Sequence, residues 1–309
     1  MDHPEHLSPE HMPSDQPYHR GYVAIIGKTN VGKSTLMNRL VGAKLSIVTS
    51  KPQTTRRRII GIASGPSHQI IFLDTPGILT PRYGLQKRML VAATRAIKEA
   101  DLVLWMIDVS AGTSAAEECG LVLPRIGKGK AVVLALNKID LVRKEKLLPL
   151  IDEYQKRVGP ESIVPMSALT RDGVDRLVGE MVVRLPIGPP YYPPDTLTEH
   201  PERFFVSEII LEKIFERYGE EIPYSSCVEI EEFSERPERK DFIRANVYVE
   251  KKSQKAILIG RGGTALKKVG ELARRDIEEL LGRPVYLELW VKVRPGWRKS
   301  ERDLRRLGY

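Results

Sequence analysis

The sequence predicts two folded domains in series: a doubly wound α/β domain with a mostly parallel sheet, then a smaller α+β domain. Residues 21–185 alternate short apolar runs with amphipathic helical stretches, which is the pattern of βαβ units. Residues 186–194 then contain five prolines, which interrupt regular structure. Residues 199–309 resume helix and strand patterns in a different order. A length of 309 residues is consistent with two domains.

Composition sets the class of protein. The chain is 41% hydrophobic, enough for packed cores, and no apolar run approaches the ~18 residues that would suggest a membrane span. Residues 1–20 are polar and lack the apolar stretch of a signal peptide, so we expect a disordered tail. Cys119 and Cys227 lie far apart in sequence, which favours reduced thiols and a cytoplasmic location.

The first chemical motif is at residues 27–34, which match the phosphate-binding pattern G-x-x-x-x-G-K-[ST]. A strand-like run at 22–26 precedes it and a helical segment at 35–40 follows, as the motif requires. Glycines turn backbone N–H groups onto phosphate oxygens, and the helix N-terminus adds positive charge. Lys33 would reach the β- and γ-phosphates, and Ser34 would hold Mg²⁺. The alternative is a glycine-bearing turn that matches by chance. The expected nucleotide contacts are Gly27, Asn30, Val31, Gly32, Lys33, Ser34 and Thr35.

A second motif, at residues 74–77, makes the chance match improbable. Asp74 ends the buried run 70–73, where a second Mg²⁺ anchor belongs, and the Gly77 N–H could sense the γ-phosphate. Ile78 follows, where Ras-like enzymes carry a water-orienting Gln. Because Ile78 cannot hydrogen-bond to water, we expect slow intrinsic hydrolysis.

A third motif, residues 137–140, ends the run 132–136 and selects the base. The Asp140 carboxylate only accepts hydrogen bonds, so it suits the adjacent N1–H and 2-amino donors of guanine and repels adenine. On its own the motif could be a turn after a strand. A fourth strand-like run, 163–166, precedes two further contacts. The expected base-side residues are Asn137, Lys138, Asp140, Ser167, Ala168 and Leu169.

These motifs fall at strand C-terminal ends, where doubly wound sheets bind ligands. Helices are expected to begin near residues 33, 84, 115, 144 and 174. Residues 186–198 should form a stiff, extended connector that marks the domain boundary.

The second domain should hold a helix at 201–217, strands at 225–231 and 243–249, a helix at 264–281 and a strand at 285–291. The segment 254–259 can be a short helix or a strand. Residues 199–240 carry 12 acidic and 6 basic side chains, whereas residues 241–309 carry 9 acidic and 17 basic ones. The basic part and its C-terminal tail favour an anionic polymer as partner, although a charge run is more often a solvated surface.

Residues 260–263 read Gly-Arg-Gly-Gly and fit the GXXG loop of a KH domain, which clamps about four single-stranded nucleotides. A plain junction between two helices is the alternative, and the order of the surrounding elements favours KH. The expected RNA contacts are Ile259, Gly260, Arg261, Gly262, Gly263, Lys267, Lys268, Arg298 and Lys299.

A single G domain, a Pro-rich linker and a KH-like domain together resemble the Era GTPases. The resemblance covers about residues 20–309, so the first 20 residues fall outside it. Besides the motifs above, it rests on segments 51–56, 167–169, 203–205 and 287–293.

This resemblance implies a ribosome assembly factor that binds GTP or GDP and small-subunit ribosomal RNA near its 3′ end, with GTP controlling the bound state. Mg²⁺ would be held by Ser34, Asp74 and a switch threonine, for which we choose Thr55 over Thr54. Lys33, Thr55 and Gly77 would serve hydrolysis, and Asn30 would help to hold K⁺. The small ribosomal subunit is the expected partner and a monomer the expected state. Peripheral association with the inner face of the cell membrane is also implied.

Two rival functions are weighed against this. One is a nucleotide-gated RNA-binding module in which hydrolysis is incidental. The other is a tRNA-modification GTPase, which should carry a functional C-terminal Cys. Because the last cysteine is Cys227, we discount the second.

Overall fold

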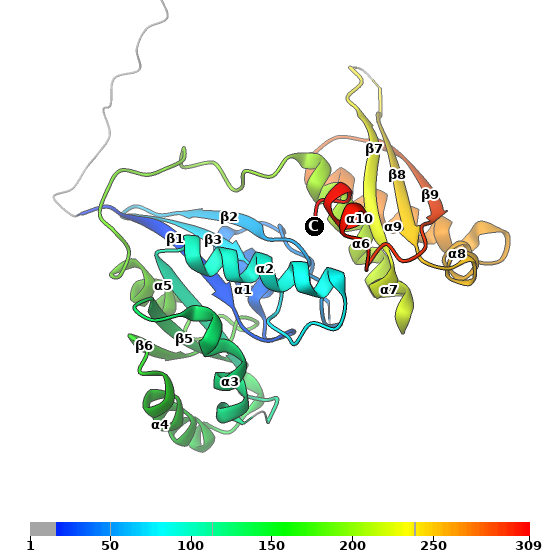
Figure 1. Ribbon diagram of the computed structural model, residues 1–309. Helices are drawn as coiled ribbons and strands as arrows, with labels where there is room; N and C mark the ends of the chain where they lie inside the picture. The colour runs from blue at the N-terminus through cyan, green and yellow to red at the C-terminus, as the bar shows by residue number, and fades with distance from the viewer. Residues whose placement is uncertain (1–16, 50, 113, 238) are drawn as a thin grey trace, which may run out of the picture.

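The computed structural model describes residues 17–49, 51–112, 114–237 and 239–309. Two layered bodies are joined by an extended segment (Figure 1). Within the described ranges, no helix is both long and apolar enough to cross a bilayer.

The N-terminal domain is built on a six-stranded sheet of order β2-β3-β1-β4-β5-β6. Strands β3, β4, β5 and β6 run parallel to β1, and β2 runs antiparallel to its neighbour β3. The predicted doubly wound, mostly parallel sheet is confirmed. The strands are β1 (His19–Ile26), β2 (Ile59–Ser64), β3 (His68–Asp74), β4 (Leu102–Asp108), β5 (Ala131–Asn137) and β6 (Ser162–Pro165).

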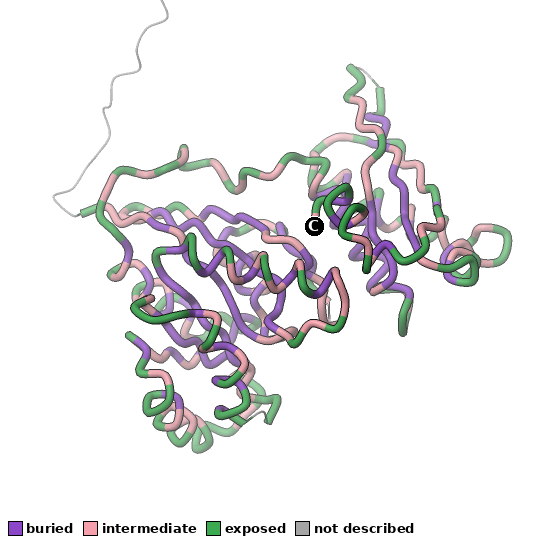
Figure 2. The backbone as a smooth tube through the Cα atoms, in the orientation of Figure 1, coloured by how far each residue is buried: buried purple, intermediate pink, exposed green. Residues whose placement is uncertain are grey.

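Helices cover both faces of this sheet, which is why its central strands are apolar throughout (Figure 2). One core joins α1 (Lys33–Val41) and α5 (Val174–Val182) to the sheet. The other joins α2 (Gly84–Glu99), α3 (Ala115–Ile126) and α4 (Leu147–Val158). Helices were predicted near 33, 84, 115 and 174, and they begin there. Near 144 the chain instead makes a single 3₁₀ turn, Lys144–Lys146, before α4 begins. Another 3₁₀ turn is Ile139–Leu141.

The prediction for the N-terminal tail needs correction at its end. His19 and Arg20 belong to β1, because their backbones pair with His68 and Gln69 of β3. Residues 1–16 lie outside the described residues.

Residues 186–198 form no helix or strand, as their prolines predict, but they lie against the sheet rather than apart from it. Ile187 makes an isolated bridge with His19. The Gln69 side-chain oxygen accepts hydrogen bonds from the backbones of Tyr191 and Tyr192, at 2.8 and 3.0 Å. The Thr198 hydroxyl donates to the Ile60 carbonyl. The connector is therefore anchored along its length.

The C-terminal domain is a three-stranded sheet, β7-β8-β9, with helices packed on one face. Strand β8 runs antiparallel to β7 and parallel to β9. The element order matches the predicted KH order, and segment 254–259 proves helical. The elements are α6 (Glu202–Arg217), α7 (Glu221–Ser225), β7 (Cys227–Ser234), β8 (Asp241–Val249), α8 (Lys252–Ile259), α9 (Thr264–Leu281) and β9 (Val285–Val293).

One strand begins later than predicted. Residue 225 was expected to open a strand, but it closes the short helix α7, and β7 starts at Cys227. The Ser225 and Ser226 hydroxyls both bond back to the Ile222 carbonyl, which holds this turn.

The basic C-terminal segment is packed, not extended. Trp297 is completely buried, and its indole N–H donates to the Ser225 carbonyl at 2.9 Å. The last helix, α10 (Glu301–Arg306), contacts α2 of the other domain. Leu85 and Met89 of α2 share a core with Trp297 and Leu304. The segment therefore fastens the two domains together.

Candidate nucleotide and RNA sites

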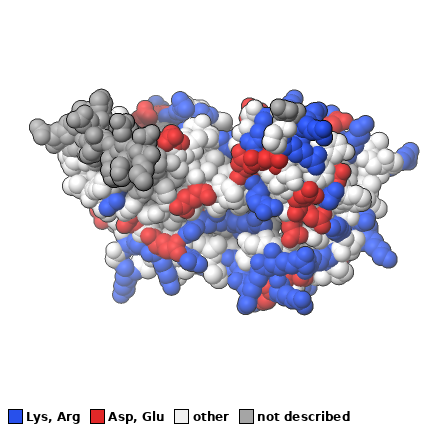
Figure 3. All heavy atoms as spheres, turned by 90° about the horizontal axis from the view of Figure 1, so that it is seen from above, with Lys and Arg blue, Asp and Glu red and all other residues white. Residues whose placement is uncertain are grey.

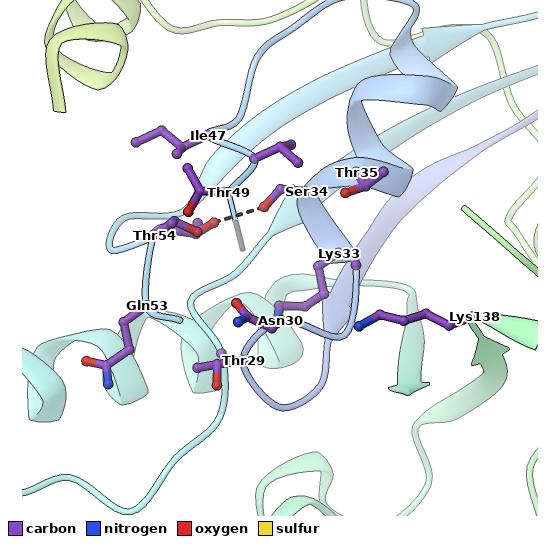
Figure 4. A pocket seen from close by; sticks show the side chains of 14 residues that line it. Thr29, Asn30, Lys33, Ser34, Thr35, Ile47, Thr49, Gln53, Thr54 and Lys138 are labelled. Atoms are coloured by element: carbon purple, nitrogen blue, oxygen red, sulfur yellow. Dashed lines mark hydrogen bonds between the residues drawn. The ribbon is translucent and has the colours of Figure 1, made fainter. Parts of the chain in front are cut away.

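A cavity of about 320 Å³ opens at the C-terminal edge of the six-stranded sheet (Figure 4). The phosphate loop lies on one side, and residues 47–49 and 53–55 lie on the other. We call the described residues between 44 and 57, which connect α1 to β2, the switch segment. Predicted residues that line the cavity are Asn30, Gly32, Lys33, Ser34, Thr35, Thr55, Gly77 and Lys138. Thr29, a variable position of the phosphate-binding motif, and Thr54, the alternative switch threonine, line it as well. Sequence reasoning missed Ile47, Val48, Thr49 and Gln53, which belong to no phosphate-binding or base-binding motif.

Glycine is required at two points of the phosphate loop. Gly27 and Gly32 have φ of 147° and 98°, a region that favours glycine. A Cβ at Gly27 would lie 2.3 Å from the Met106 carbonyl oxygen, and one at Gly32 would lie 2.3 Å from the Asn137 amide nitrogen. The Val31 side chain is 3% exposed and packs in the core of the domain, so only its backbone can contact a ligand.

Lys33 is the cation of this loop. Its Nζ donates to the Lys28 carbonyl at 2.7 Å, and its side chain is buried. Burial lowers the pKa of Lys33 to about 8, although the carboxylates of Asp74 and Glu118 oppose the shift. A buried cation of this kind favours an anionic group in the cavity.

Three oxygen-bearing side chains meet beside it. The Ser34 hydroxyl lies 3.0 Å from that of Thr55 (Figure 4). It also donates to Asp74 Oδ2 at 2.8 Å. Ser46 donates to the same oxygen at 2.9 Å. Asp74 Oδ1 is buried and has no hydrogen-bond partner among the described residues. Burial raises the pKa of Asp74, partly offset by Lys33.

This set fits Mg²⁺, which takes hard oxygen ligands, and the unpartnered carboxylate oxygen is where a cation would be expected. Thr54 lines the cavity too, but the bond to Ser34 comes from Thr55, which supports the choice of Thr55 as the switch threonine.

Gly77 lies against the phosphate loop. A Cβ there would be 2.8 Å from the Thr29 backbone nitrogen, so only glycine fits without a shift. The next residue, Ile78, donates its N–H to the Gly27 carbonyl at 2.9 Å and buries its side chain in the core at 1% exposure. Ile78 thus points away from the cavity, in agreement with the expectation that it cannot orient water.

The structure gives Asn137 a role that its motif does not reveal. Its side chain is 2% exposed: Nδ2 donates to the Val31 carbonyl at 2.7 Å, and Oδ1 accepts from the Ala168 N–H at 2.9 Å. It joins the phosphate loop to the Ser167 loop and so positions the site. Lys138 lines the cavity, whereas Asp140 and Leu169 are exposed and are not among its lining residues.

In the second domain, the GXXG loop links α8 to α9 through a 3₁₀ turn, Arg261–Gly263. Gly260, Gly262 and Gly263 have φ of 75°, 59° and 79°, and a Cβ at 262 or 263 would meet open space. The backbone is therefore accessible, and Arg261 is exposed beside it. This is the geometry that a strand of nucleotides can approach closely.

A groove of about 480 Å³ runs from this loop along α9 and β9. Its lining combines apolar residues, on which bases can pack, with cations that phosphates can contact. Its lining comprises Lys240, Gly263, Leu266, Lys267, Gly270, Glu271, Arg274, Val285, Tyr286, Leu287 and Leu289. Lys268 is exposed and paired with Glu271 at 3.1 Å. Over the face in Figure 3, Lys and Arg project in broader groups than Asp and Glu.

Arg298 was predicted to contact RNA, and the structure uses it differently. Its guanidinium is paired with Glu250 and lies 5.2 Å from the Tyr83 ring centroid. Lys299 is exposed but lies next to it against α2, among none of the groove residues. The tail serves the interface between domains because its apolar residues are buried there.

Sequence reasoning also missed how the switch segment holds the second domain. Lys51 donates to the Phe215 and Tyr218 carbonyls at the end of α6. Buried Arg56 donates to the Pro223 and Ser226 carbonyls at the end of α7, at 2.7 and 2.6 Å.

Arg57 of the same segment donates to the Leu307 carbonyl just after α10. Three switch cations thus bond to carbonyls at the C-terminal ends of three helices, where free carbonyls and the helix dipole favour positive charge.

Comparison with known proteins agrees with both sites. A family model described as "50S ribosome-binding GTPase" matches residues 22–138, and one described as "KH domain" matches residues 221–298. GTPase Era of Geobacter metallireducens is 46% identical over 297 residues, 96% of this chain and 99% of that protein. The chain belongs to the Era GTPase family. It is accordingly a GTPase. GTPase ERA1 of Zea mays chloroplasts is also 46% identical, over 94% of this chain and 70% of that protein.

Solved Era structures share the whole architecture. The Era protein of Aquifex aeolicus bound to GDP·AlF₄⁻ matches with a TM-score of 0.90 and 41% identity, over 94% of this chain and 99% of that one. An Era in complex with MgGDPNP and nucleotides 1506–1542 of 16S ribosomal RNA matches with a TM-score of 0.89 and 42% identity, over the same shares.

Proposed function

We propose that this Era protein binds the 3′-terminal segment of small-subunit ribosomal RNA in its KH groove. We further propose that bound GTP controls this RNA binding during small-subunit assembly. One observation carries the proposal: the switch segment touches both the nucleotide cavity and the RNA-binding domain. Thr55 lies at the nucleotide cavity, and its neighbours Arg56 and Arg57 are bonded to the RNA-binding domain.

The phosphate end of the nucleotide would be held by the loop N–H groups and Lys33. Ser34, Thr55 and Asp74 would hold Mg²⁺, which when bound neutralises charge between the β- and γ-phosphates. The Gly77 N–H, fixed against Thr29, can donate to a γ-phosphate oxygen. The Lys138 side chain lines the cavity toward the base, and Asp140 would accept from guanine.

The RNA side rests on the groove beside the GXXG loop. The Era relative solved with nucleotides 1506–1542 of 16S ribosomal RNA supports the same ligand here. Exposed glycine backbone at 262 and 263 allows a sugar-phosphate chain to approach, and Arg261 and Lys267 supply positive charge.

Coupling between the sites follows from adjacency in the chain. Thr55 would be a ligand of Mg²⁺ when GTP is bound, and loss of that contact would free Arg56 and Arg57 from the helix ends they bond to. The orientation of the KH domain would then change with the nucleotide. If hydrolysis were incidental, RNA binding would track the bound nucleotide, and turnover would be equal with and without RNA.

Two further proposals extend this. Because Ile78 is buried and cannot help a water molecule, we propose that Asn30, in the phosphate loop with φ of 61°, helps to hold K⁺ beside the phosphates. We also propose a cytoplasmic location, supported by two buried cysteines that form no disulfide. The monomeric state stays a prediction. Peripheral membrane association stays a prediction from the family.

The test is an RNA-binding titration with a 3′-terminal oligonucleotide, in a GTP analogue and in GDP. Arg261→Asp with Gly262→Asp should abolish binding and leave GTP binding intact. The matched control is Lys128→Asp with Gly129→Asp, another exposed cation followed by a glycine with positive φ and open space around it. Wild-type affinity in the first variant, with a normal thermal melt, would overturn the proposed RNA site.

A further inference from the structure

The sheet of the KH domain has a second face that the helices do not cover. Its first face, with Ile243, Ala245 and Val247, packs on the helices. Because side chains alternate along a strand, the neighbouring residues point the other way. At one end this second face is covered by the Trp297 segment, which packs on Cys227 and Tyr248. At the other end the strand register places Phe242 and Tyr286 on it, and Tyr286 also lines the RNA groove. We call the part between these two ends the outer face; it comprises Glu229, Glu231, Glu232, Arg244, Asn246, Glu288, Trp290 and Lys292.

Trp290 is the most unusual residue of this face. It is 56% exposed, whereas the other two tryptophans, Trp105 and Trp297, are fully buried. It stands on β9, the edge strand of the sheet (Figure 1), and does not line the RNA groove. An exposed indole offers a flat π surface on which a planar cation can stack.

The outer face is acidic in a chain whose net charge is +9. It holds four glutamates and two cations, and both cations are paired within it. Arg244 lies 3.3 Å from Glu232 and 3.0 Å from Glu288, and Lys292 lies 3.3 Å from Glu231. The surplus carboxylates repel phosphodiesters, which argues against a second RNA site.

Asn246 adds an unfilled acceptor at the same place. It pairs with Trp290 on one side and Glu229 on the other in the strand register. Its side chain is 2% exposed, and Oδ1 has no hydrogen-bond partner among the described residues. Buried polar atoms are normally satisfied, so this one favours a donor from outside.

We propose that the outer face binds an arginine-rich segment of a partner protein. A guanidinium stacks on Trp290 and donates to Glu288 and to Asn246 Oδ1. Arginine fits better than lysine, because a planar guanidinium stacks and donates from several N–H groups at once. None of the outer-face residues lines the GXXG groove, so protein and RNA can be held together.

The test uses the full chain and a fluorescently labelled octa-arginine peptide, with octa-lysine as the probe for charge alone. Trp290→Ala should weaken octa-arginine binding by roughly 5- to 30-fold, since the lost stacking is worth about 1–2 kcal/mol. Glu288→Gln should weaken it as well. Leu148→Ala, a 74% exposed apolar residue of the other domain, is the matched control and should change nothing.

Equal octa-arginine affinity in Trp290→Ala, Glu288→Gln and wild type overturns the proposal. So does equal binding of octa-lysine and octa-arginine to the wild type. A single-stranded RNA that loses as much affinity in Trp290→Ala as the peptide does also overturns it, because the face then reads RNA. Thermal melts confirm that each variant is folded.

Discussion

Arg56→Ala should open the interface between the two domains. The Arg56 guanidinium is 5% exposed, donates to the Pro223 and Ser226 carbonyls, and lies 5.1 Å from the Phe215 ring centroid. A hydrogen bond to a charged group contributes about 1.5–3 kcal/mol, and the alanine also leaves two buried carbonyls unpaired. We take the lower end for the two bonds, about 3 kcal/mol, because burying the guanidinium offsets part of the gain.

Cys227 provides the assay. It is completely buried in the core formed by Trp297, Leu304 and α2, so it can react only when the interface opens. Burial raises the pKa of Cys227 to about 12, which makes the thiol inert while it is covered. The rate of its reaction with a disulfide reagent therefore reports the free energy of opening. Three kcal/mol corresponds to a roughly 100-fold faster reaction.

Arg58→Ala is the matched control. This variant also removes one positive charge, two positions later in the chain. Arg58, however, forms a partly exposed salt bridge with Glu99, which is worth about 0–1 kcal/mol. In Arg58→Ala the rate at which Cys227 reacts with the disulfide reagent should change by no more than about fivefold. Arg56 itself lowers the pKa of Cys227, so its loss alone would slow the reaction. A rate in Arg56→Ala equal to that in Arg58→Ala would therefore refute the reasoning.

Three other outcomes are expected. Asp140→Asn should shift preference from GTP toward XTP in a competition assay, because an amide can donate to the 2-keto oxygen of xanthine; an unchanged preference for GTP would show that Asp140 does not read the base. GTP hydrolysis should be faster in K⁺ than in Na⁺ at equal ionic strength, and Asn30→Ala should remove the difference; equal rates in the two salts would exclude the cation. Burial lowers the pKa of His200, whose Nε2 accepts from the Ile60 N–H at 3.2 Å. The unfolded chain then binds more protons below about pH 6.5, so His200 contributes stability above that pH that is lost on acidification. The gap in urea midpoint between wild type and His200→Gln should shrink from about pH 7.5 to about pH 5.5, and a constant gap would contradict the assignment.

The residues of each local site could be predicted from the sequence because they are contiguous in the chain. The loop around Lys33, the carboxylate of Asp74 at a strand end and the glycines at 260–263 each need only their own neighbours in the chain. Alternating apolar runs likewise predicted a parallel sheet, since strands buried on both faces must be apolar throughout.

Tertiary structure decided what joins these parts. Asn137 bonds to Val31 and Ala168, residues 106 and 31 positions away, so its positioning role cannot be read from its motif. Arg56 and Arg57 reach carbonyls 167 to 250 positions along the chain. Free carbonyls at helix ends carry no sequence signature, because every residue has one.

The basic tail shows the same limit. Its charges suggested an arm for RNA, but Trp297, Leu304 and Leu307 bury it between the domains and Arg298 is paired with Glu250. The sequence shows which positions carry cations, but it does not show which anions those cations contact in the folded protein. Burial of the apolar side chains of the tail determines its path, and that path places Arg298 beside Glu250.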